Sequence, residues 1–358
     1  MAYTTIDDGS AHFHTQLYTG NGTNGTAITN DANAGNFQPD WLWIKSRSSG
    51  SRGHRLYDSS RGAANDLRTH GTNGDTQESN ALASFNSDGF TIGSAVDVND
   101  NSETFVAWQW IANGGTTSSD SNGSITSTVQ ANTTAGFSIV TYTGNATSGA
   151  TVGHGLGKAP SWYICKRRSN TGHWEVYHEG NTSAPQTEHI RLSATSATED
   201  SNEYWNDTAP TSSVFSLGNH VNVNENANTY VAYCFAEIKG YSKFGKYTGN
   251  GSQNGTFVYT GFKPAWIMAK RTGAAKNWYI ADSARSPNNV NKAHLVANSS
   301  DAEDTSGDAT DSYFDILSNG FKLRQDFSHL NASGAEHIYM AFAEHPFVSS
   351  KGVPTTAR

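Results

Sequence analysis

The sequence has little charge and no concentration of basic residues. Charged side chains make up 16% of the 358 residues, and 24 Lys and Arg stand against 32 Asp and Glu, giving a formal net charge of −8. An average domain carries roughly 25% charged residues. A protein that binds the nucleic-acid backbone needs clustered Lys and Arg to neutralise phosphates. The composition therefore argues against nucleic acid as a partner.

The chain also lacks a long hydrophobic run. Its longest apolar clusters, at residues 41–44 and 105–111, have the length of a β-strand, whereas a membrane helix needs roughly 20 apolar residues. The opening MAYTTIDDGS is polar and acidic, unlike the basic end and apolar core of a secretory signal peptide. We therefore expect no membrane insertion and synthesis without a signal peptide.

Cysteine is scarce as well. Cys165 lies in WYICK and Cys234 in YVAYCFA, both apolar and strand-like. Free cysteines are among the most buried residues, and disulfides are rare in proteins made in a reducing cytoplasm. A disulfide stays open as an alternative, and two buried free thiols are the favoured interpretation.

The strongest positive signal is internal repetition, because five landmarks recur three times in the same order. They are a YTGN string at Tyr18, Tyr142 and Tyr247, a Pro-x-Trp at Pro39, Pro160 and Pro264, a lysine at Lys45, Lys166 and Lys270, a turn-rich string at Ser84, Ser213 and Asp315, and a closing aromatic strand matched on Ala107, Ala232 and Ala341. The spacing predicts three units of about 100 residues each.

Each unit reads as short strands separated by turns rich in Gly, Asn, Asp, Ser and Thr, with no helical periodicity. This pattern is typical of β-sandwiches and jelly rolls. We predict an all-β fold of three tandem sandwich repeats over residues 1–113, 135–240 and 241–347. The Ser/Thr/Asn/Gly-rich stretch 114–134 predicts a flexible linker, and 348–358 a flexible tail. The second and third repeats have no spacer between them and should pack rigidly.

Tryptophans could form the cores or stack on sugar rings. Trp41, Trp162 and Trp266 share one strand position with apolar neighbours, which predicts core residues. Trp174, Trp205 and Trp278 have more polar neighbours and are better candidates for exposure, although the core interpretation is still favoured.

Candidate catalytic acids do not form a shared set. Glu237 and Glu344 stand at matching strand ends where the first repeat has Asn113. Asp58 and Asp282 lie in related strings where the second repeat has His178. Because paired-acid catalysis needs two carboxylates in a common site, we predict no catalytic residues and no enzyme activity.

The two D-S-x-R strings place Asp58 near Arg61 and Asp282 near Arg285. A carbohydrate or carboxylate site is the sharper interpretation of this pattern. The favoured interpretation is an exposed ion pair that shapes a loop and contributes little stability.

Metal sites are not indicated either. The histidines His12, His14 and His154 lack zinc-ligand spacing. Two oxygen-rich stretches have the alternation of a calcium loop without its glycine and distal acid, namely Asp97, Asn99 and Asn101, and Asp120, Asn122 and Ser124. Loop-bound calcium stays open, and we predict no metal residues and no cofactor. The ligand-binding residues are not identified by the sequence.

Several long blocks resemble a family of virion proteins of tailed phages, common in phages of marine bacteria and often labelled tail fibre. The blocks include MAYTTIDDGSAHFHTQLYTGNG, FQPDWLWIKSR, RLYDSSRGA, SFNSDGFTIG, GFSIVTYTGNATSGATVGHGLGKAPSWYICKRR, YSKFGKYTGNG and AFAEHPF. The resemblance spans nearly the whole chain and implies a non-enzymatic structural protein on the virion surface. It supplies no catalytic residues. The chain is also similar, more loosely, to sandwich domains that end phage fibres.

Three functions follow from this resemblance in order of preference. The first is a tail appendage or fibre-like adhesin that recognises a host-surface glycan. The second is a capsid decoration or head-fibre protein, and the third is a polysaccharide-degrading tail spike. The sequence has no heptad shaft or collagen-like repeat, which weakens a long-fibre interpretation. The implied partners are other virion proteins of the tail or capsid, and both a homotrimer and a monomer of three repeats remain open.

Overall fold

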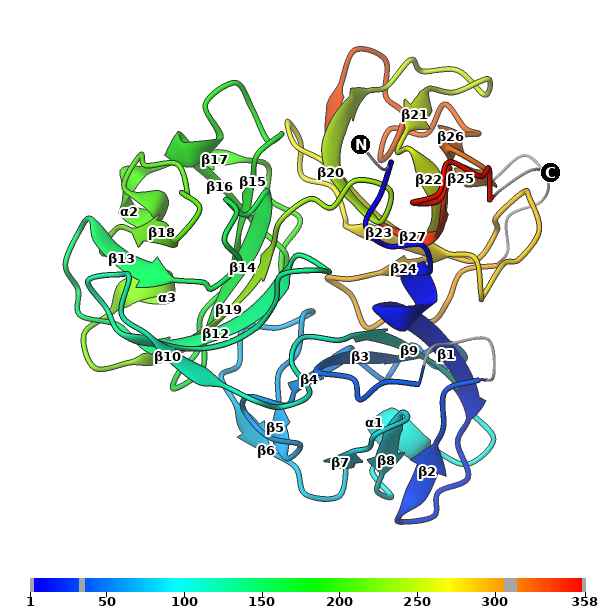
Figure 1. Ribbon diagram of the computed structural model, residues 1–358. Coiled ribbons are helices and arrows are strands. Elements are labelled where there is room, and N and C mark those ends of the chain that lie inside the picture. Colours follow the sequence, from blue (N-terminus) through cyan, green and yellow to red (C-terminus); the bar gives the residue numbers. More distant parts are fainter. Residues whose placement is uncertain (1–2, 32–35, 306–313, 356–358) are drawn as a thin grey trace.

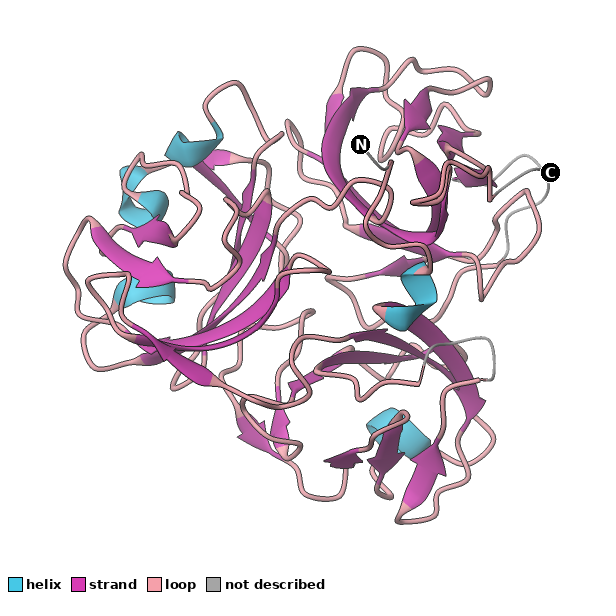
Figure 2. Ribbon diagram, viewed as in Figure 1, coloured by secondary structure: helices cyan, strands magenta, loops and turns pink. Residues whose placement is uncertain are grey.

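Strands dominate the protein. The structure, a computed structural model, describes residues 3–31, 36–305 and 314–355. Its helical segments are single turns that lie beside the sheets (Figure 2). The predicted all-β sandwich class is confirmed. We keep the names unit 1, unit 2 and unit 3 for residues 1–113, 135–240 and 241–347.

Unit 1 combines a large sheet of order β1-β9-β3-β4 with a small sheet of order β2-β8-β7 and the pair β5-β6. Its elements are η1 (Gly9–Ala11), β1 (Phe13–Thr19), β2 (Thr26–Ile28), β3 (Trp41–Ser46), β4 (Arg55–Asp58), β5 (Asn65–Asp66), β6 (Thr76–Gln77), β7 (Leu82–Phe85), β8 (Phe90–Ile92), α1 (Val96–Asn99) and β9 (Thr104–Trp110). The apolar side chains between the two sheets form the core of this unit.

Unit 2 repeats this plan with a longer sheet, β10-β11-β12-β19-β14-β15-β16-β17, facing the pair β13-β18. The first two strands of this sheet come from residues 114–134, ahead of unit 2. The elements are β10 (Ser118–Asp120), β11 (Ser127–Asn132), β12 (Phe137–Thr143), β13 (Ala150–Gly153), β14 (Trp162–Arg167), β15 (Trp174–His178), η2 (Pro185–Thr187), β16 (Glu188–Arg191), β17 (Glu199–Asp200), α2 (Asn202–Trp205), β18 (Val214–Leu217), α3 (Val221–Asn224) and β19 (Thr229–Phe235). Cys165 and Cys234 are free and buried here, as expected.

Unit 3 has a large sheet β20-β27-β22-β23-β24 and a small sheet β21-β26-β25. Its strands are β20 (Ser242–Thr248), β21 (Phe257–Tyr259), β22 (Phe262–Arg271), β23 (Tyr279–Asp282), β24 (Leu295–Val296), β25 (Phe314–Leu317), β26 (Gly320–Leu323) and β27 (Glu336–Pro346). In all three large sheets the strand that carries the tryptophan of the Pro-x-Trp motif pairs with the closing strand of its unit.

Strand register corrects one part of the sequence alignment. Trp41 pairs with Trp110, and Trp266 pairs with Phe342. Counting back three residues from these partners, Ala107 corresponds to Tyr339 rather than to Ala341. A shift of two residues leaves every side chain on the same face of a strand, so the hydrophobic pattern could not reveal it.

The predicted linker is not a free segment in the structure. Residues 114–134 contain β10 and β11, and β11 pairs with the edge of β12. A strand that adds to an existing edge is held by main-chain hydrogen bonds and needs little apolar content, which is why its composition resembled a linker. The predicted flexible tail also has contacts, since Ser350 donates from its N–H and its hydroxyl to Asp7.

The recurrent YTGN string builds a clasp in each unit. The tyrosine hydroxyls donate to a backbone oxygen at 2.8 Å, in the pairs Tyr18 with Val98, Tyr142 with Val223 and Tyr247 with Leu330. The string's asparagine N–H donates to an asparagine side chain at 2.9–3.0 Å, in the pairs Asn21 with Asn99, Asn145 with Asn224 and Asn250 with Asn331. The glycine is required because a Cβ on it would collide with a backbone oxygen of the facing loop, at Asp100, Glu225 or Ala332.

One aromatic core joins the three units, which are arranged around a common centre (Figure 1). Near this centre the Phe342 ring lies 5.5 Å from Trp110 and 5.8 Å from Phe235, centroid to centroid. The tryptophans predicted as core residues are fully buried, and so are the three that were candidates for exposure: Trp41, Trp162, Trp266, Trp174, Trp205 and Trp278. The aromatic content therefore holds the units together.

Candidate functional site

Ring N–H groups connect each unit to its neighbour at corresponding positions. Trp174 and Trp278 occupy the place of His54, counted from the strand partners of Trp41, Trp162 and Trp266. Their ring nitrogens reach backbone oxygens of the adjacent unit at 2.9–3.0 Å, in the pairs His54 with Val296, Trp174 with Arg68 and Trp278 with Arg191. The His54 contact joins units 3 and 1, the Trp174 contact joins units 1 and 2, and the Trp278 contact joins units 2 and 3. We call these contact regions junctions 3–1, 1–2 and 2–3. Because each unit contacts both others, the units close into a ring.

Junction 1–2 buries the first D-S-x-R pair. Asp58 and Arg61 form an ion pair of 2.5 Å in which both side chains are fully buried. Tyr233 of unit 2 donates its hydroxyl to Asp58 at 2.6 Å, and Arg61 also contacts Asp75 at 2.8 Å. The sequence predicted an exposed pair, and that was wrong because the neighbouring unit covers it. The structural role that the sequence favoured is what the contacts show.

Junction 3–1 repeats this arrangement with other partners. Asp282 and Arg285 form a fully buried pair of 2.5 Å, and the Trp108 indole donates to Asp282 at 3.0 Å. Glu303 accepts from Arg285 at 2.9 Å and from Arg47 at 2.8 Å. Burial raises the pKa of Glu303, but the two arginines outweigh it and hold that pKa below its usual range.

Junction 2–3 uses a neutral group at the same position. His178 pairs in register with Trp162, as Asp58 does with Trp41. Its Nδ1 accepts from the Gly180 N–H at 2.8 Å, and its Nε2 donates to the Tyr339 carbonyl at 3.1 Å. Burial lowers the pKa of His178 to about 4, so the imidazole is neutral at pH 7.

The three landmark lysines are buried at the same junctions. Lys166 donates to the carbonyls of Thr72 and Gly172 at 2.9 and 2.8 Å, and Lys270 donates to Thr195 at 3.3 Å. Burial lowers the pKa of Lys166 and Lys270 to about 7, and that of Lys45 to about 8. A lysine with a lowered pKa can act as a nucleophile, but these amines face backbone oxygens. Lys166 and Lys270 connect two units, whereas Lys45 donates to the Ser46 and Ser49 carbonyls of its own unit.

The remaining candidate acids lie in separate ion pairs. Glu237 contacts Lys243 at 2.9 Å, and Glu344 contacts Lys263 at 2.8 Å. Glu179 lies near Glu237, and burial together with that neighbouring charge raises the pKa of Glu179. Asp282 is committed to Arg285. The position of each acid is thus explained by a local cation.

The two possible calcium loops are used for other bonds. In the first, Asp97 pairs with Arg55 and Asn99 belongs to the unit 1 clasp. In the second, Asp120 accepts from the N–H and the side-chain amide of Asn122 at 2.8 Å. No group of three or more His, Cys, Asp or Glu suited to a metal occurs among residues 3–31, 36–305 and 314–355. Within the same ranges, no helix is long and apolar enough to cross a membrane.

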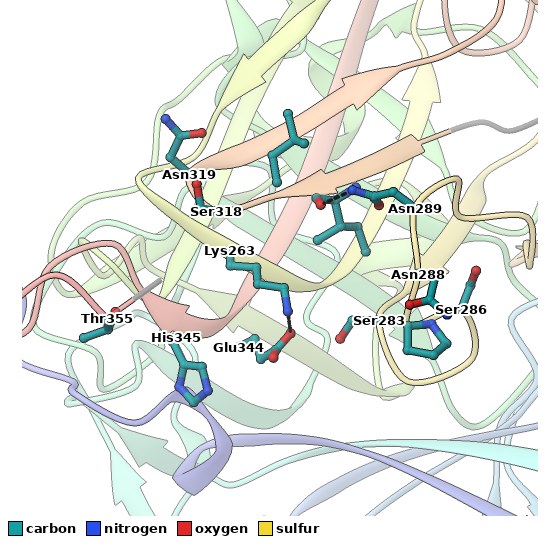
Figure 3. A pocket seen from close by; sticks show the side chains of 13 residues that line it. Lys263, Ser283, Ser286, Asn288, Asn289, Ser318, Asn319, Glu344, His345 and Thr355 are labelled. Carbon is teal, nitrogen blue, oxygen red and sulfur yellow. Dashed lines mark hydrogen bonds and ion pairs between the residues drawn. The ribbon is translucent and has the colours of Figure 1, made fainter. Parts of the chain in front are cut away.

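A polar pocket of about 670 Å³ opens on unit 3 (Figure 3). It lies where the loop after β23, the β25–β26 turn and the end of β27 meet. In Figure 3 Lys263 points toward Glu344, which neutralises it, and amide and hydroxyl side chains surround the pair. The polar lining consists of Lys263, Ser283, Ser286, Asn288, Asn289, Ser318, Asn319, Glu344, His345 and Thr355.

One wall of the polar pocket is held in place from inside. Asn289 donates to the Ile316 carbonyl at 2.7 Å and accepts from the Ile316 N–H at 2.9 Å. This fixes the loop after β23 against β25 and presents the exposed Asn288 at the rim. Sequence reasoning singled out Glu344 but not the Ser-Pro-Asn-Asn loop, whose only signal was its turn composition.

A second pocket of about 480 Å³ adjoins the first at junction 3–1, and we call it the junction pocket. The two share Ser283, Glu344 and His345. The junction pocket is lined on its other side by the start of β1, including Phe13 and Thr15. Together the pockets hollow the surface where the chain's first and last strands meet.

Comparison with known proteins identifies the family without a function. No curated protein matches the chain significantly, and no solved structure does either. The family model described as Domain of unknown function (DUF7483) matches residues 8–346. The chain therefore belongs to the DUF7483 family.

Proposed function

We propose that this protein is a non-enzymatic structural protein of a tailed-phage virion, acting as a tail appendage that adheres to a host-surface glycan. The observation that carries the proposal is the polar pocket. The other motif residues, in the YTGN and D-S-x-R strings, form hydrogen bonds and ion pairs within and between the units. The resemblance of the repeated blocks to tailed-phage virion proteins supports the same assignment.

The chemistry of the polar pocket suits a sugar. Its side chains are mainly amides and hydroxyls, which donate and accept hydrogen bonds without net charge. The one cation and the one acid within it neutralise each other at 2.8 Å. A volume of about 670 Å³ falls in the range of small-ligand sites. A neutral, hydroxyl-rich ligand matches this lining better than a phosphate or an apolar molecule.

The closed ring supports an adhesive role through preorganisation. A binding surface on a body braced by buried ion pairs, indoles and lysines loses little conformational entropy when it binds. Adhesion then requires no catalytic group, in keeping with the local pairing of the candidate acids.

The proposal is tested by adhesion of the purified full chain to host cells. We expect binding that falls with Asn288→Ala and Asn319→Ala in the polar pocket. Lys322→Ala, a half-buried position outside that pocket, serves as the control and should bind normally. Labelled antibody should locate the protein on the tail of intact particles. Adhesion that ignores both asparagine variants would overturn the assignment of the site.

A capsid decoration or head-fibre protein is the second candidate. The three-lobed arrangement around one centre would match a threefold position of a capsid lattice (Figure 1). In that case the protein rebinds stripped heads and does not adhere to cells.

A polysaccharide-degrading spike is the third candidate, and it would release oligosaccharides in a reaction abolished by Glu344→Gln.

A further inference from the structure

Junction 1–2 contains a strand that the other junctions lack among residues 3–31, 36–305 and 314–355. β11 adds to the free edge of β12, with Gln130 opposite Ile139 and Asn132 opposite Phe137. Main-chain pairing therefore extends the large sheet of unit 2 toward unit 1.

The side chain of Gln130 fills the space that remains between the units. Its amide nitrogen donates to the hydroxyls of Ser59 and Ser60 at 3.0 and 2.8 Å. Its oxygen accepts from the backbone N–H groups of Asn113 and Gly115 at 3.1 and 2.8 Å. One amide inserted from β11 thus satisfies two hydroxyls and two N–H groups on the unit 1 side of the junction.

The corresponding place at junction 3–1 is the junction pocket. Tyr18 in unit 1 is equivalent to Tyr142 in unit 2. Phe13 and Thr15 of β1, five and three residues before Tyr18, therefore correspond to Phe137 and Ile139 of β12. Counted from Asp58 and Asp282, Ser283 takes the position of Ser59. The pocket of about 480 Å³ is lined by these three unit 1 and unit 3 residues, among others. β11 therefore has a counterpart space that no described strand fills.

The edge of β1 presents the groups that an added strand needs. The Ile111 N–H donates to the His12 carbonyl at 3.2 Å, which sets the alternation of the β1–β9 ladder. In an antiparallel pair this directs the main-chain groups of Phe13 and Thr15 away from β9. The Thr15 hydroxyl is buried without a hydrogen-bond partner among the described residues.

Junction 2–3 offers no such space. A Cβ at Gly180 of unit 2 would lie 3.5 Å from the Gly245 carbonyl carbon on β20. Lys243 and Glu237 form an ion pair of 2.9 Å in the same region. Junction 1–2 is therefore filled by a strand, junction 2–3 is closed by direct contact, and junction 3–1 is open.

We propose that the junction pocket binds an extended strand of a partner polypeptide, which pairs antiparallel with the edge of β1 as β11 pairs with β12. The partner strand resembles Ser127–Asn132, polar and uncharged, with a Gln or Asn side chain that inserts opposite Thr15 and against Ser283. Strand addition of this kind takes affinity from main-chain bonds and specificity from alternate side chains. The inference does not depend on the proposed function.

The test uses the full chain and a labelled synthetic peptide of residues 125–134, ITSTVQANTT. Fluorescence anisotropy should show saturable binding. Ser283→Arg fills the pocket, and Thr15→Pro removes an outward N–H from an edge strand without removing a bond to β9. We expect each to weaken binding by about tenfold or more. Asn288→Arg, which lies in the polar pocket only, is the matched control and should bind normally.

Hydrogen exchange locates the bound peptide. Protection of the Phe13 and Thr15 amides supports the proposal, while protection at Phe137 and Ile139 would mean displacement of β11 and overturn it. Thermal melts of each variant ensure that lost binding is not lost folding. Absence of peptide binding would also overturn the proposal, as would equal binding by Ser283→Arg and Asn288→Arg. A dimer that Ser283→Arg abolishes, without peptide binding, would replace the partner strand by a second copy of the chain.

Discussion

Junctions 1–2 and 2–3 place a charged and a neutral residue, respectively, at the same strand position. At junction 1–2 a buried carboxylate, Asp58, is held by Arg61 and by the Tyr233 hydroxyl. At junction 2–3 the corresponding residue is His178, which is neutral and bonds only to backbone groups in the contacts described above. Other contacts between the units differ as well. Asp75 forms an ion pair with Arg168 at junction 1–2, whereas the Thr198 N–H donates to the Thr272 carbonyl at junction 2–3.

The comparison teaches that the position, rather than the charge, is what the fold requires. A strand-end side chain must satisfy a loop N–H of its own unit and contact a donor or acceptor of the next. A buried carboxylate does so at a large desolvation cost that Arg61 must offset. A neutral imidazole avoids this cost, but it is sensitive to acid because its charged form is not stabilised there.

The largest expected effect comes from breaking the charged junction. Arg61→Met leaves Asp58 buried without its cation and should lower the free energy of unfolding by about 3–5 kcal/mol. Arg285→Met at junction 3–1 is the matched change and should cost a similar amount. Urea unfolding of both variants measures it. A loss below about 1 kcal/mol would show that the charges are not essential to the junction.

Truncating a tryptophan of the shared aromatic core should lower the free energy of unfolding by a similar amount in units 2 and 3. Trp162→Ala and Trp266→Ala each remove a fully buried indole, and truncation of this size costs about 3–5 kcal/mol. Denaturant midpoints compared with the parent give the result. An unchanged midpoint for either variant would contradict its placement in the shared core.

Acid should weaken junction 2–3 through the buried, neutral His178. The pKa of His178 is about 4 in the folded protein, below the usual value near 6.5 for an unfolded chain. The unfolded state therefore binds the proton more readily, and stability is full above about pH 6.5 and falls as the pH drops toward 4. His178→Gln should make this loss shallower in urea titrations across that range. An identical pH profile would show that other buried histidines dominate.

The smallest effect is expected at an ion pair away from the junctions. Lys246 and Glu336 lie 3.4 Å apart, with side chains 49% and 42% exposed. Solvent-exposed pairs contribute about 0–1 kcal/mol, so Lys246→Met should barely change the unfolding midpoint. A loss as large as that of Arg61→Met would remove the distinction between buried and exposed pairs.

Sequence reasoning worked best where a residue type serves its own unit. The YTGN strings predicted turns, and the clasp explains their tyrosine, glycine and asparagine. The correspondence of His178 with Asp58 and Asp282 was also visible in the sequence and agrees with the strand register. These features depend on neighbours within one repeat, so a linear pattern can carry them.

Sequence reasoning failed where a residue is completed by another unit. Nothing in D-S-x-R shows that Tyr233 or Trp108 will cover the pair. The same applies to β11, whose partner is an edge rather than a hydrophobic face. The polar pocket was missed because its lining comes from five stretches that are not adjacent in sequence, four of them in unit 3 and the fifth, Thr355, in the tail.

The sequence by itself determined the strand content, the recurring landmarks and the core character of its repeated tryptophans, because alternation and turn chemistry are local properties of the chain. Only the tertiary structure decided that the units close into a ring, that two ion pairs and three lysines are buried, and that one junction is left open. Burial and pairing across units depend on which surfaces meet, and that choice is made by the whole packed chain.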